Sequence, residues 1–357
     1  GIHNYIHQLL THLPAAVPDD WHLLAMVGGA NRADYPGVAM QRAGLNPLAD
    51  LAYRNQIHKV LDKAGFDAVL AYGIKPIIHG IPVAKAAGIP RLLAMVTGLG
   101  SAFIEVKTPK QQAVHWVARF GYKHAFGKAH HIFFQNTQDR QDLEKFGLLG
   151  QTPTSIIAGS GVALSAYPRQ PLPPADKSIR FLFVGRLIKH KGILEFLQAA
   201  TLLQQTGKQA EFWVVGGEDP NPSALKLETL KQDFPSIKFF GSVSNVPELL
   251  AQSHVFVLPS YREGTPRSAL EAMAKGRAVI VADTPGCRDV VDHQVSGLKV
   301  AVQDPDALAN AMQSYIDDPS LCLTHGEAGY ERAASIYDVK KVNADIIETI
   351  KSLEVLP

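Results

Sequence analysis

The stretch that decides the fold of this chain is residues 179–192, which reads IRFLFVGRLIKHKG. Its core, Phe181–Val184, is apolar at every position, so both faces of a strand here would be hydrophobic. That pattern is typical of parallel strands that helices cover on both sides. A glycine, Gly185, ends the run, and a helical pattern over Ile193–Gln205 follows the basic segment. The stretch therefore predicts a strand, a turn and a helix of an α/β fold.

Short apolar runs alternate with helical patterns along the 357 residues. Strands that alternate with helices indicate parallel sheets built from βαβ units. Four prolines within Ala166–Lys177 predict a linker, because proline lacks an amide donor. We therefore expect two doubly wound, Rossmann-like domains, residues 1–165 and 178–335, that face each other across a cleft. The predicted strands are Trp21–Val27, Ala68–Tyr72, Pro90–Val96, His131–Phe134, Ser155–Ile157, Ile179–Val184, Glu211–Val215, Ile237–Phe240, His254–Leu258 and Ala278–Val281, and further helices are predicted over Leu48–Ala64 and Tyr337–Leu353.

The composition supports a folded, two-domain protein and excludes several classes. Hydrophobic residues make up 46% of the chain, which rules out a disordered protein. Lys+Arg number 35 and Asp+Glu 33, and this net charge of +2 argues against a nucleic-acid-binding protein. No apolar run approaches the roughly 20 residues that span a bilayer. Two cysteines, Cys287 and Cys322, form no disulfide framework and fit a reducing compartment.

The turn after the Phe181–Val184 run has the chemistry of a phosphate site. Gly185 lets a ligand approach the backbone, and the amino end of the next helix favours anions. Arg186 and Lys191 add two cations at that point. We interpret the turn as a site for a phosphate or diphosphate; the alternative is an ordinary strand–helix turn with two solvated bases.

A second strand–turn–helix segment covers residues 259–273 and reads PSYREGTPRSALEAM. Pro266 suits a first helical turn, and the amides around it would face an anion. Glu263 lies on the predicted loop and Glu271 inside the helix, so they are not a hydrolytic pair and more plausibly accept hydrogen bonds from sugar and ribose hydroxyls. The alternative is a pair of solvated charges at a helix start, which the apolar neighbours of Glu271 disfavour.

Together these segments resemble the retaining glycosyltransferases of family 4, which have the GT-B fold. The resemblance rests on the Gly-Arg-Leu and Lys-Gly pairs of the first segment and on two glutamates eight residues apart in the second. It runs in order through Ile179–Leu298 and is looser in the first half, through Lys75-Pro76, residues 97–100 and residues 157–162. The subset it is most similar to builds bacterial capsule, O-antigen or lipid-linked glycans.

The resemblance implies a role for each matched residue. Arg186 and Lys191 would hold the donor diphosphate and neutralise the leaving group, and Glu263 would bind donor-sugar hydroxyls. Glu271 would hold the ribose. The other donor-site residues it implies are Gly1, Gly185, Gly216, Val243, Gly264, Thr265, Pro266 and Arg267. One position departs from the family pattern: Ala163 follows Gly161-Val162 where an Asp is common.

The implied reaction is transfer of a hexose or N-acetylhexosamine from a nucleotide-diphosphate sugar, a UDP-sugar above all. The acceptor would be a glycan or a polyprenyl-diphosphate-linked glycan in cell-surface polysaccharide synthesis, with retention and with no cofactor or metal. A GT-B sugar-nucleotide epimerase and a non-catalytic nucleotide-sugar-binding protein stay open as alternatives. Asp304-Pro305-Asp306 resembles a metal-binding Asp-x-Asp motif, but Pro305 before a helical pattern favours a helix cap.

Two surfaces of the first half are candidates for the acceptor and for the membrane. On the acceptor side the candidates are Lys75, Thr97, Gly98 and Glu105, with solvated surface charge as the alternative for the two charged residues. Residues 106–129 contain no acid and interleave bases with aromatics, which is typical of a helix in an anionic lipid interface. The alternative is a helix packed on the first domain. The membrane candidates are Lys110, Trp116, Arg119, Phe120 and Lys123.

The ends of the chain carry two further expectations. The chain opens on Gly1 and a helical pattern over Ile2–Leu13, where the resembled family has a preceding strand, so we expect the first domain to be truncated. In that family the last helix, here within residues 336–357, crosses back to the first domain. We expect an enzyme in the cytoplasm, at the inner face of the membrane.

Overall fold

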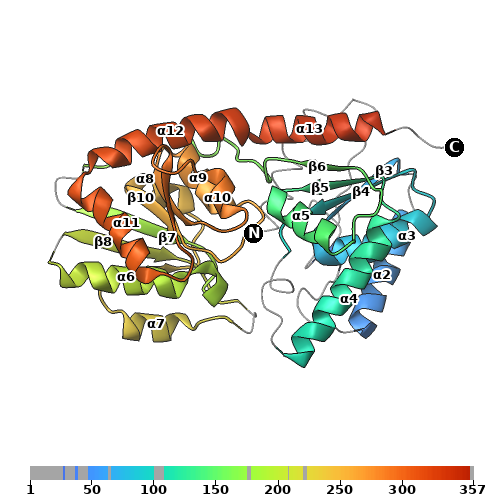
Figure 1. The fold of residues 1–357 in the computed structure, drawn as a ribbon, viewed down its shortest axis with the longest axis horizontal. Coiled ribbons are helices and arrows are strands. Elements are labelled where there is room, and N and C mark those ends of the chain that lie inside the picture. Colours follow the sequence, from blue (N-terminus) through green and yellow to red (C-terminus); the bar gives the residue numbers. More distant parts are fainter. Residues whose placement is uncertain are drawn as a thin grey trace. The chain divides into compact units, whose positions relative to one another are not determined.

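The computed structural model describes residues 27–28, 37–38, 47–62, 66–99, 108–174, 178–207, 209–219 and 223–353 (Figure 1). The chain forms two compact units. The first consists of Gly1–Ser160 together with Val339–Pro357, and the second is Gly161–Asp338.

The first unit is built on a parallel sheet in the order β3-β4-β5-β6. Its strands are β3 (Ala68–Tyr72), β4 (Arg91–Val96), β5 (His131–Phe134) and β6 (Thr154–Ile156), and a separate parallel pair joins β1 (Val27–Gly28) to β2 (Gly37–Val38). Its helices are α2 (Pro47–Leu61), the π-helical turn η1 (Pro76–Gly80), α3 (Ile81–Ala86), α4 (Pro109–Phe126), α5 (Thr137–Lys145) and α13 (Val339–Ser352).

The residues of β4 show why this sheet is covered on both faces. Alternate side chains of a strand point to opposite faces. Leu92, Ala94 and Val96 pack in one core with α2, α3 and α4, whereas Leu93 and Met95 pack in another with α13. In Figure 1, α13 and α4 lie on opposite sides of the strands. The last helix of the chain therefore completes the core of the first unit.

The second unit holds a six-stranded parallel sheet in the order β12-β11-β10-β7-β8-β9. Its strands are β7 (Ile179–Val184), β8 (Ala210–Val215), β9 (Lys238–Gly241), β10 (Val255–Leu258), β11 (Ala278–Ala282) and β12 (Gly297–Val300). Its helices are the 3₁₀ turn η3 (Lys189–Lys191), α6 (Ile193–Gln205), α7 (Leu227–Asp233), α8 (Val246–Gln252), α9 (Arg267–Ala274), α10 (Cys287–Val290), α11 (Pro305–Asp317) and α12 (Ser320–Ile336). The central strands β7, β10 and β11 are buried almost throughout.

The predicted strands agree with the structure to within a residue or two wherever the structure describes them. The sequence analysis missed β12, a short strand that contains Lys299 and pairs with β11. The expected helix Ile2–Leu13 and most of the expected strand Trp21–Val27 lie outside the described residues. The expected helix cap at Asp304 is confirmed, because its carboxylate accepts from the amide of Ala307 at 2.8 Å at the start of α11.

The proline-rich segment is held to the second unit by a buried arginine. Arg277 is fully buried, and its guanidinium donates to the carbonyl oxygens of Gln170 and Pro171. It also donates to the carbonyls of Ala251, Ser253 and Lys275. A buried cation must be hydrogen-bonded, and these carbonyl oxygens supply the acceptors that the buried guanidinium of Arg277 needs.

Candidate active site

Three loops meet at the carboxyl edge of the second sheet. They follow β7 (residues 185–192), β10 (residues 259–266) and β11 (residues 283–286). The Tyr261 amide donates to the carbonyl of His190 at 3.0 Å, and the Glu263 amide donates to that of Pro285 at 3.1 Å. These bonds join the two predicted chemical segments, which lie about 70 residues apart in the sequence, into one site.

Two glycines let these loops approach closely. Gly192, just before α6, has φ 74°, and a Cβ there would lie 2.1 Å from the carbonyl oxygen of Pro259. Gly286 has φ 78°, and its Cβ would lie 2.2 Å from the carbonyl oxygen of Gly264. No other residue type fits this backbone and this spacing. The sequence analysis did not single out Gly286.

Lys191 and Glu263 form an ion pair across the first two loops. The ammonium of Lys191 donates to Glu263 Oε1, and their side chains are 20% and 14% exposed. Two residues predicted from separate segments are thus in direct contact. The alternative of a solvated base is therefore wrong for Lys191, and that of a solvated helix-start charge is wrong for Glu263.

Arg186 has a carboxylate partner that the sequence analysis missed. Its Nη1 donates to Asp219 Oδ2 at 3.0 Å, while the arginine side chain remains 56% exposed. Asp219 follows β8, the strand next to β7, so their carboxyl ends are adjacent. Both predicted cations of the turn are therefore paired with carboxylates, and an incoming polyanion would exchange for those partners.

Glu271 is buried near the middle of α9, five residues after the N-cap Pro266. Arg267 Nε lies 2.8 Å from Glu271 Oε1, one helical turn away. Burial raises the pKa of the Glu271 carboxyl, and the charge of Arg267 and a hydrogen bond from Tyr167 oppose that shift. The solvated alternative is therefore wrong for Glu271 as well, and the predicted donor-site residue Arg267 is its ion-pair partner.

The remaining predicted donor-site residues of this unit line the ends of neighbouring strands. Gly185 donates its amide to Val215, and Gly216 donates to Gly241 at 2.9 Å. A Cβ on Gly216 would lie 1.9 Å from the carbonyl oxygen of Gly185, so position 216 needs glycine. Val243 is half-buried in the turn after β9. Gly264 and Thr265 lie in the β10 loop between Glu263 and α9, and Gly1 lies outside the described residues.

The acceptor candidates of the first unit also gather at one sheet edge. Lys75 follows β3 and its ammonium lies 2.7 Å from Asp50 Oδ1, with side chains 14% and 18% exposed. Thr97 and Gly98 follow the neighbouring strand β4. Lys75 is therefore not a solvated surface charge, and its partner Asp50 was missed by the sequence analysis. Glu105 lies outside the described residues.

Helix α4 exposes aromatic side chains. Trp116 and Phe120 are 68% and 65% exposed, and their rings stack at 5.9 Å between centroids. Lys123 is exposed on the same face, one turn further on. The guanidinium of Arg119, another candidate, lies over the ring of Phe146, 4.5 Å from its centroid. The side chain of Lys110 lies outside the described residues.

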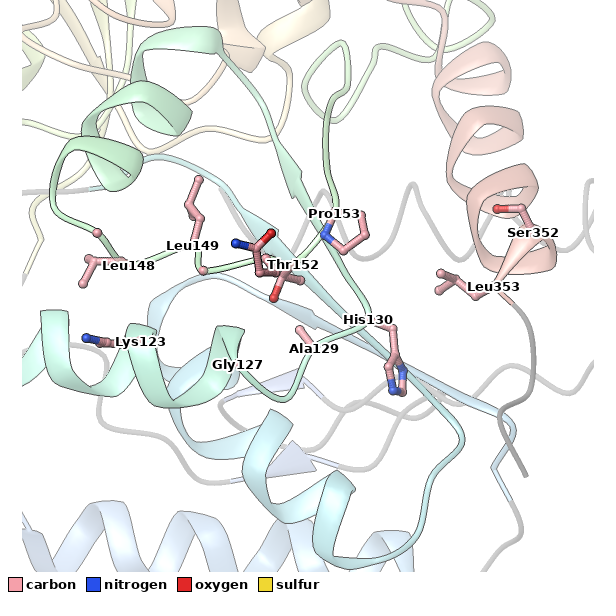
Figure 2. A pocket seen from close by; sticks show the side chains of 13 residues that line it. Lys123, Gly127, Ala129, His130, Leu148, Leu149, Thr152, Pro153, Ser352 and Leu353 are labelled. Carbon is pink, nitrogen blue, oxygen red and sulfur yellow. The ribbon is translucent and has the colours of Figure 1, made fainter.

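A cavity of about 680 Å³ lies at the opposite edge of the first sheet (Figure 2). It is lined by the end of α4, by residues 147–153 before β6, and by Ser352 and Leu353 at the end of α13. His130, just before β5, also lines it. Ligands of parallel α/β sheets bind beyond the carboxyl ends of the strands, so this cavity at the amino ends is not the predicted site.

The described helices include none with the length and hydropathy of a transmembrane segment. Likewise, the described residues bring no three His, Cys, Asp or Glu side chains together in a way that could hold a metal ion.

Known proteins similar to this chain decide its family. A family profile described as Glycosyl transferases group 1 matches residues 168–332, which include the three loops. The N,N'-diacetylbacillosaminyl-diphospho-undecaprenol alpha-1,3-N-acetylgalactosaminyltransferase of Campylobacter jejuni is 33% identical over 293 residues, 79% of this chain and 76% of that protein. The chain belongs to the group 1 glycosyltransferases. The UDP-Gal:alpha-D-GlcNAc-diphosphoundecaprenol alpha-1,3-galactosyltransferase of Escherichia coli is 27% identical to this glycosyltransferase, over 77% of this chain and 72% of that protein.

Solved structures agree on the fold of this glycosyltransferase. A sucrose-phosphate synthase from Thermosynechococcus elongatus superposes with a TM-score of 0.82 at 22% identity, covering 98% of this chain and 93% of that one. HepE from Anabaena, solved in complex with UDP, gives 0.67 at 21% identity over 86% and 84% of the chains. The expected GT-B fold, with two Rossmann-like α/β sheets, is confirmed, and so is the expected enzyme class.

Proposed function

We propose that this enzyme transfers a hexose or N-acetylhexosamine from a UDP-sugar to a polyprenyl-diphosphate-linked glycan, with retention at the anomeric carbon. The Campylobacter relative is named for an N-acetylgalactosaminyl transfer and a diphospho-undecaprenol acceptor, and the Escherichia relative for UDP-Gal and a diphosphoundecaprenol acceptor. These names support both the donor and the acceptor class.

The ion pair between Lys191 and Glu263 is the observation that carries the proposal. A cation suited to a diphosphate and a carboxylate suited to sugar hydroxyls lie in contact, as a ligand with both groups requires. When the donor binds, the diphosphate replaces Glu263 at Lys191 and Asp219 at Arg186. Glu263 is then free to accept hydrogen bonds from the sugar.

The chemistry follows from where charge develops. The bond between the anomeric carbon and the diphosphate oxygen breaks, and Lys191 and Arg186 stabilise the negative charge on the leaving diphosphate. The acceptor hydroxyl attacks the anomeric carbon from the face that the diphosphate leaves, and its proton passes to the departing phosphate oxygen. Attack on that face retains the configuration and needs no protein nucleophile. Because two cations serve the diphosphate, we propose that the enzyme needs no metal.

The direct test is transfer to a defined acceptor. The enzyme is incubated with UDP-GalNAc, UDP-GlcNAc, UDP-Gal, UDP-Glc or the matching GDP-sugars and with a polyprenyl-diphosphate-linked monosaccharide. We expect one UDP-sugar to give an elongated lipid-linked product, unchanged by EDTA, with the anomeric configuration of the donor by NMR. Isomerised nucleotide sugar, or binding without turnover or donor hydrolysis, would contradict the proposal.

We further propose that α4 rests on the cytoplasmic face of the membrane that carries the acceptor. Exposed Trp116 and Phe120 beside Lys123 suit the headgroup region of an anionic bilayer. The test is flotation with vesicles of phosphatidylcholine, with or without one quarter phosphatidylglycerol. We expect binding to the anionic vesicles and its loss in Trp116→Ser/Phe120→Ser. The matched control is Leu323→Ser, which removes a side chain 53% exposed on α12 and should leave binding unchanged. Equal flotation of the double variant would refute the proposed surface.

A further inference from the structure

Besides Glu271, the second unit contains another buried carboxylate, at the start of the helix that follows the β7 loop. Glu195 is the third residue of α6 and is only 8% exposed. The hydroxyl of Tyr261, on the β10 loop, donates to Glu195 Oε1 at 2.5 Å. Neither residue is among the predicted donor-contact residues, so a part-buried tyrosine–carboxylate bond that joins α6 to the β10 loop needs an explanation.

Tyr261 is held to the β7 loop at three points. Its hydroxyl reaches Glu195, its amide donates to the His190 carbonyl at 3.0 Å, and its ring stacks on that of His190 at 5.8 Å between centroids. The neighbouring Ser260 hydroxyl donates to the same carbonyl at 3.1 Å. His190 directly precedes Lys191, and Tyr261 stands two residues before Glu263.

We propose that Glu195 and Tyr261 are a positioning pair for the donor sugar, an inference that rests on the proposed function. The pair anchors the β10 loop to α6, so Glu263 faces Lys191 before any donor arrives. Because the loop is preorganised, its ordering adds little entropic cost when the sugar binds. Because Glu263 contacts the sugar and Lys191 the diphosphate, loss of the anchor should weaken recognition of the sugar more than recognition of the nucleotide.

The distinguishing experiment uses Tyr261→Phe, which removes one hydroxyl and keeps the ring. Affinities are measured by calorimetry for UDP and for the UDP-sugar that the wild type accepts. We expect the affinity for the UDP-sugar and its kcat/KM to fall about tenfold, the scale of a hydrogen bond to a charged group. The affinity for UDP should stay within about twofold of the wild type on the same grounds.

A double-mutant cycle tests whether the two residues act as a pair. Glu195→Ala should match the loss in Tyr261→Phe, and the double variant should lose no more than either single one. Glu195→Gln keeps an oxygen that accepts from the tyrosine hydroxyl and should restore most of the kcat/KM. The structural control is Tyr315→Phe, which removes a fully buried bond to His325 Nδ1 at 2.8 Å, away from the donor loops, and should lower stability alone.

Two results would overturn the inference by itself. One is a wild-type preference for the UDP-sugar over UDP in Tyr261→Phe, and the other is an equal loss of both affinities, which would indicate general loosening. A wild-type enzyme that neither binds nor transfers any sugar of the panel would overturn the proposed function, and this inference with it.

Discussion

Gly286→Ala is the substitution for which the structure predicts the largest effect on activity from the smallest change in chemistry. Gly286 lies outside the groups that would contact the donor, but it supports the loop that carries Glu263. A Cβ at this position would lie 2.2 Å from the carbonyl oxygen of Gly264 and 2.3 Å from that of Glu263. Real Cβ atoms do not approach closer than 3.0 Å.

Two costs follow from this geometry. The backbone at φ 78° and ψ −38° is a conformation that residues with a side chain rarely adopt, and it costs an alanine about 1–3 kcal/mol. Relief of the contact also requires the Glu263–Gly264 backbone to move by roughly 0.8 Å or more, and a misplacement near 1 Å can cost about 100-fold in rate. We therefore expect kcat/KM for sugar transfer to fall by about two orders of magnitude in a folded variant.

Gly207→Ala is the matched control. Gly207 has φ 73°, also in the range that disfavours an alanine, but no atom lies within 4 Å of its Cβ position. Its melting temperature should fall by about 2–8 °C from strain alone, with transfer at the wild-type rate. Rates are measured at least ten degrees below the melting temperature of each variant, so that unfolding does not enter them. Wild-type turnover in Gly286→Ala, or an equal loss of rate in both variants, would refute the reasoning.

The remaining predictions concern stability and the donor site. Arg277→Lys replaces a fork that donates to five carbonyls with a single ammonium, so we expect the free energy of unfolding in urea to fall by about 3–5 kcal/mol; an unchanged midpoint would contradict it. Burial lowers the pKa of His254, whose Nδ1 accepts from the Arg180 amide at 3.0 Å. The neutral ring is the folded form, so its contribution is complete above about pH 6.5 and is lost as the pH falls towards the lowered pKa, by up to about 1.4 kcal/mol per pH unit. Urea unfolding at pH 7.5 and 5.5 measures this slope, which should be smaller in His254→Gln. Glu271→Gln should lower the affinity for UDP by about 10–100-fold in calorimetry, since a charged hydrogen-bond acceptor is lost; unchanged affinity would remove Glu271 from the donor site.

The sequence by itself determined the order and bounds of nearly all strands and the loops on which the chemistry lies. Buried parallel strands are apolar on both faces, and this property is local, so β7 and β10 could be recognised without any knowledge of their neighbours. The same holds for the Asp304 cap, which depends on residues three positions apart. The sequence analysis missed the short strand β12 because Lys299 interrupts its apolar pattern. Only its pairing with β11 defines it as a strand.

The tertiary structure alone decided which charges meet. Lys191 and Glu263 are 72 positions apart, Arg186 and Asp219 are 33, and Lys75 and Asp50 are 25. No periodicity relates such residues, since their contact depends on which strand ends are neighbours in the sheet and on how closely the loops approach. Glycines such as Gly286 permit that approach, because a side chain there would collide with carbonyl oxygens of another loop. The sequence alone does not show that this other loop is nearby.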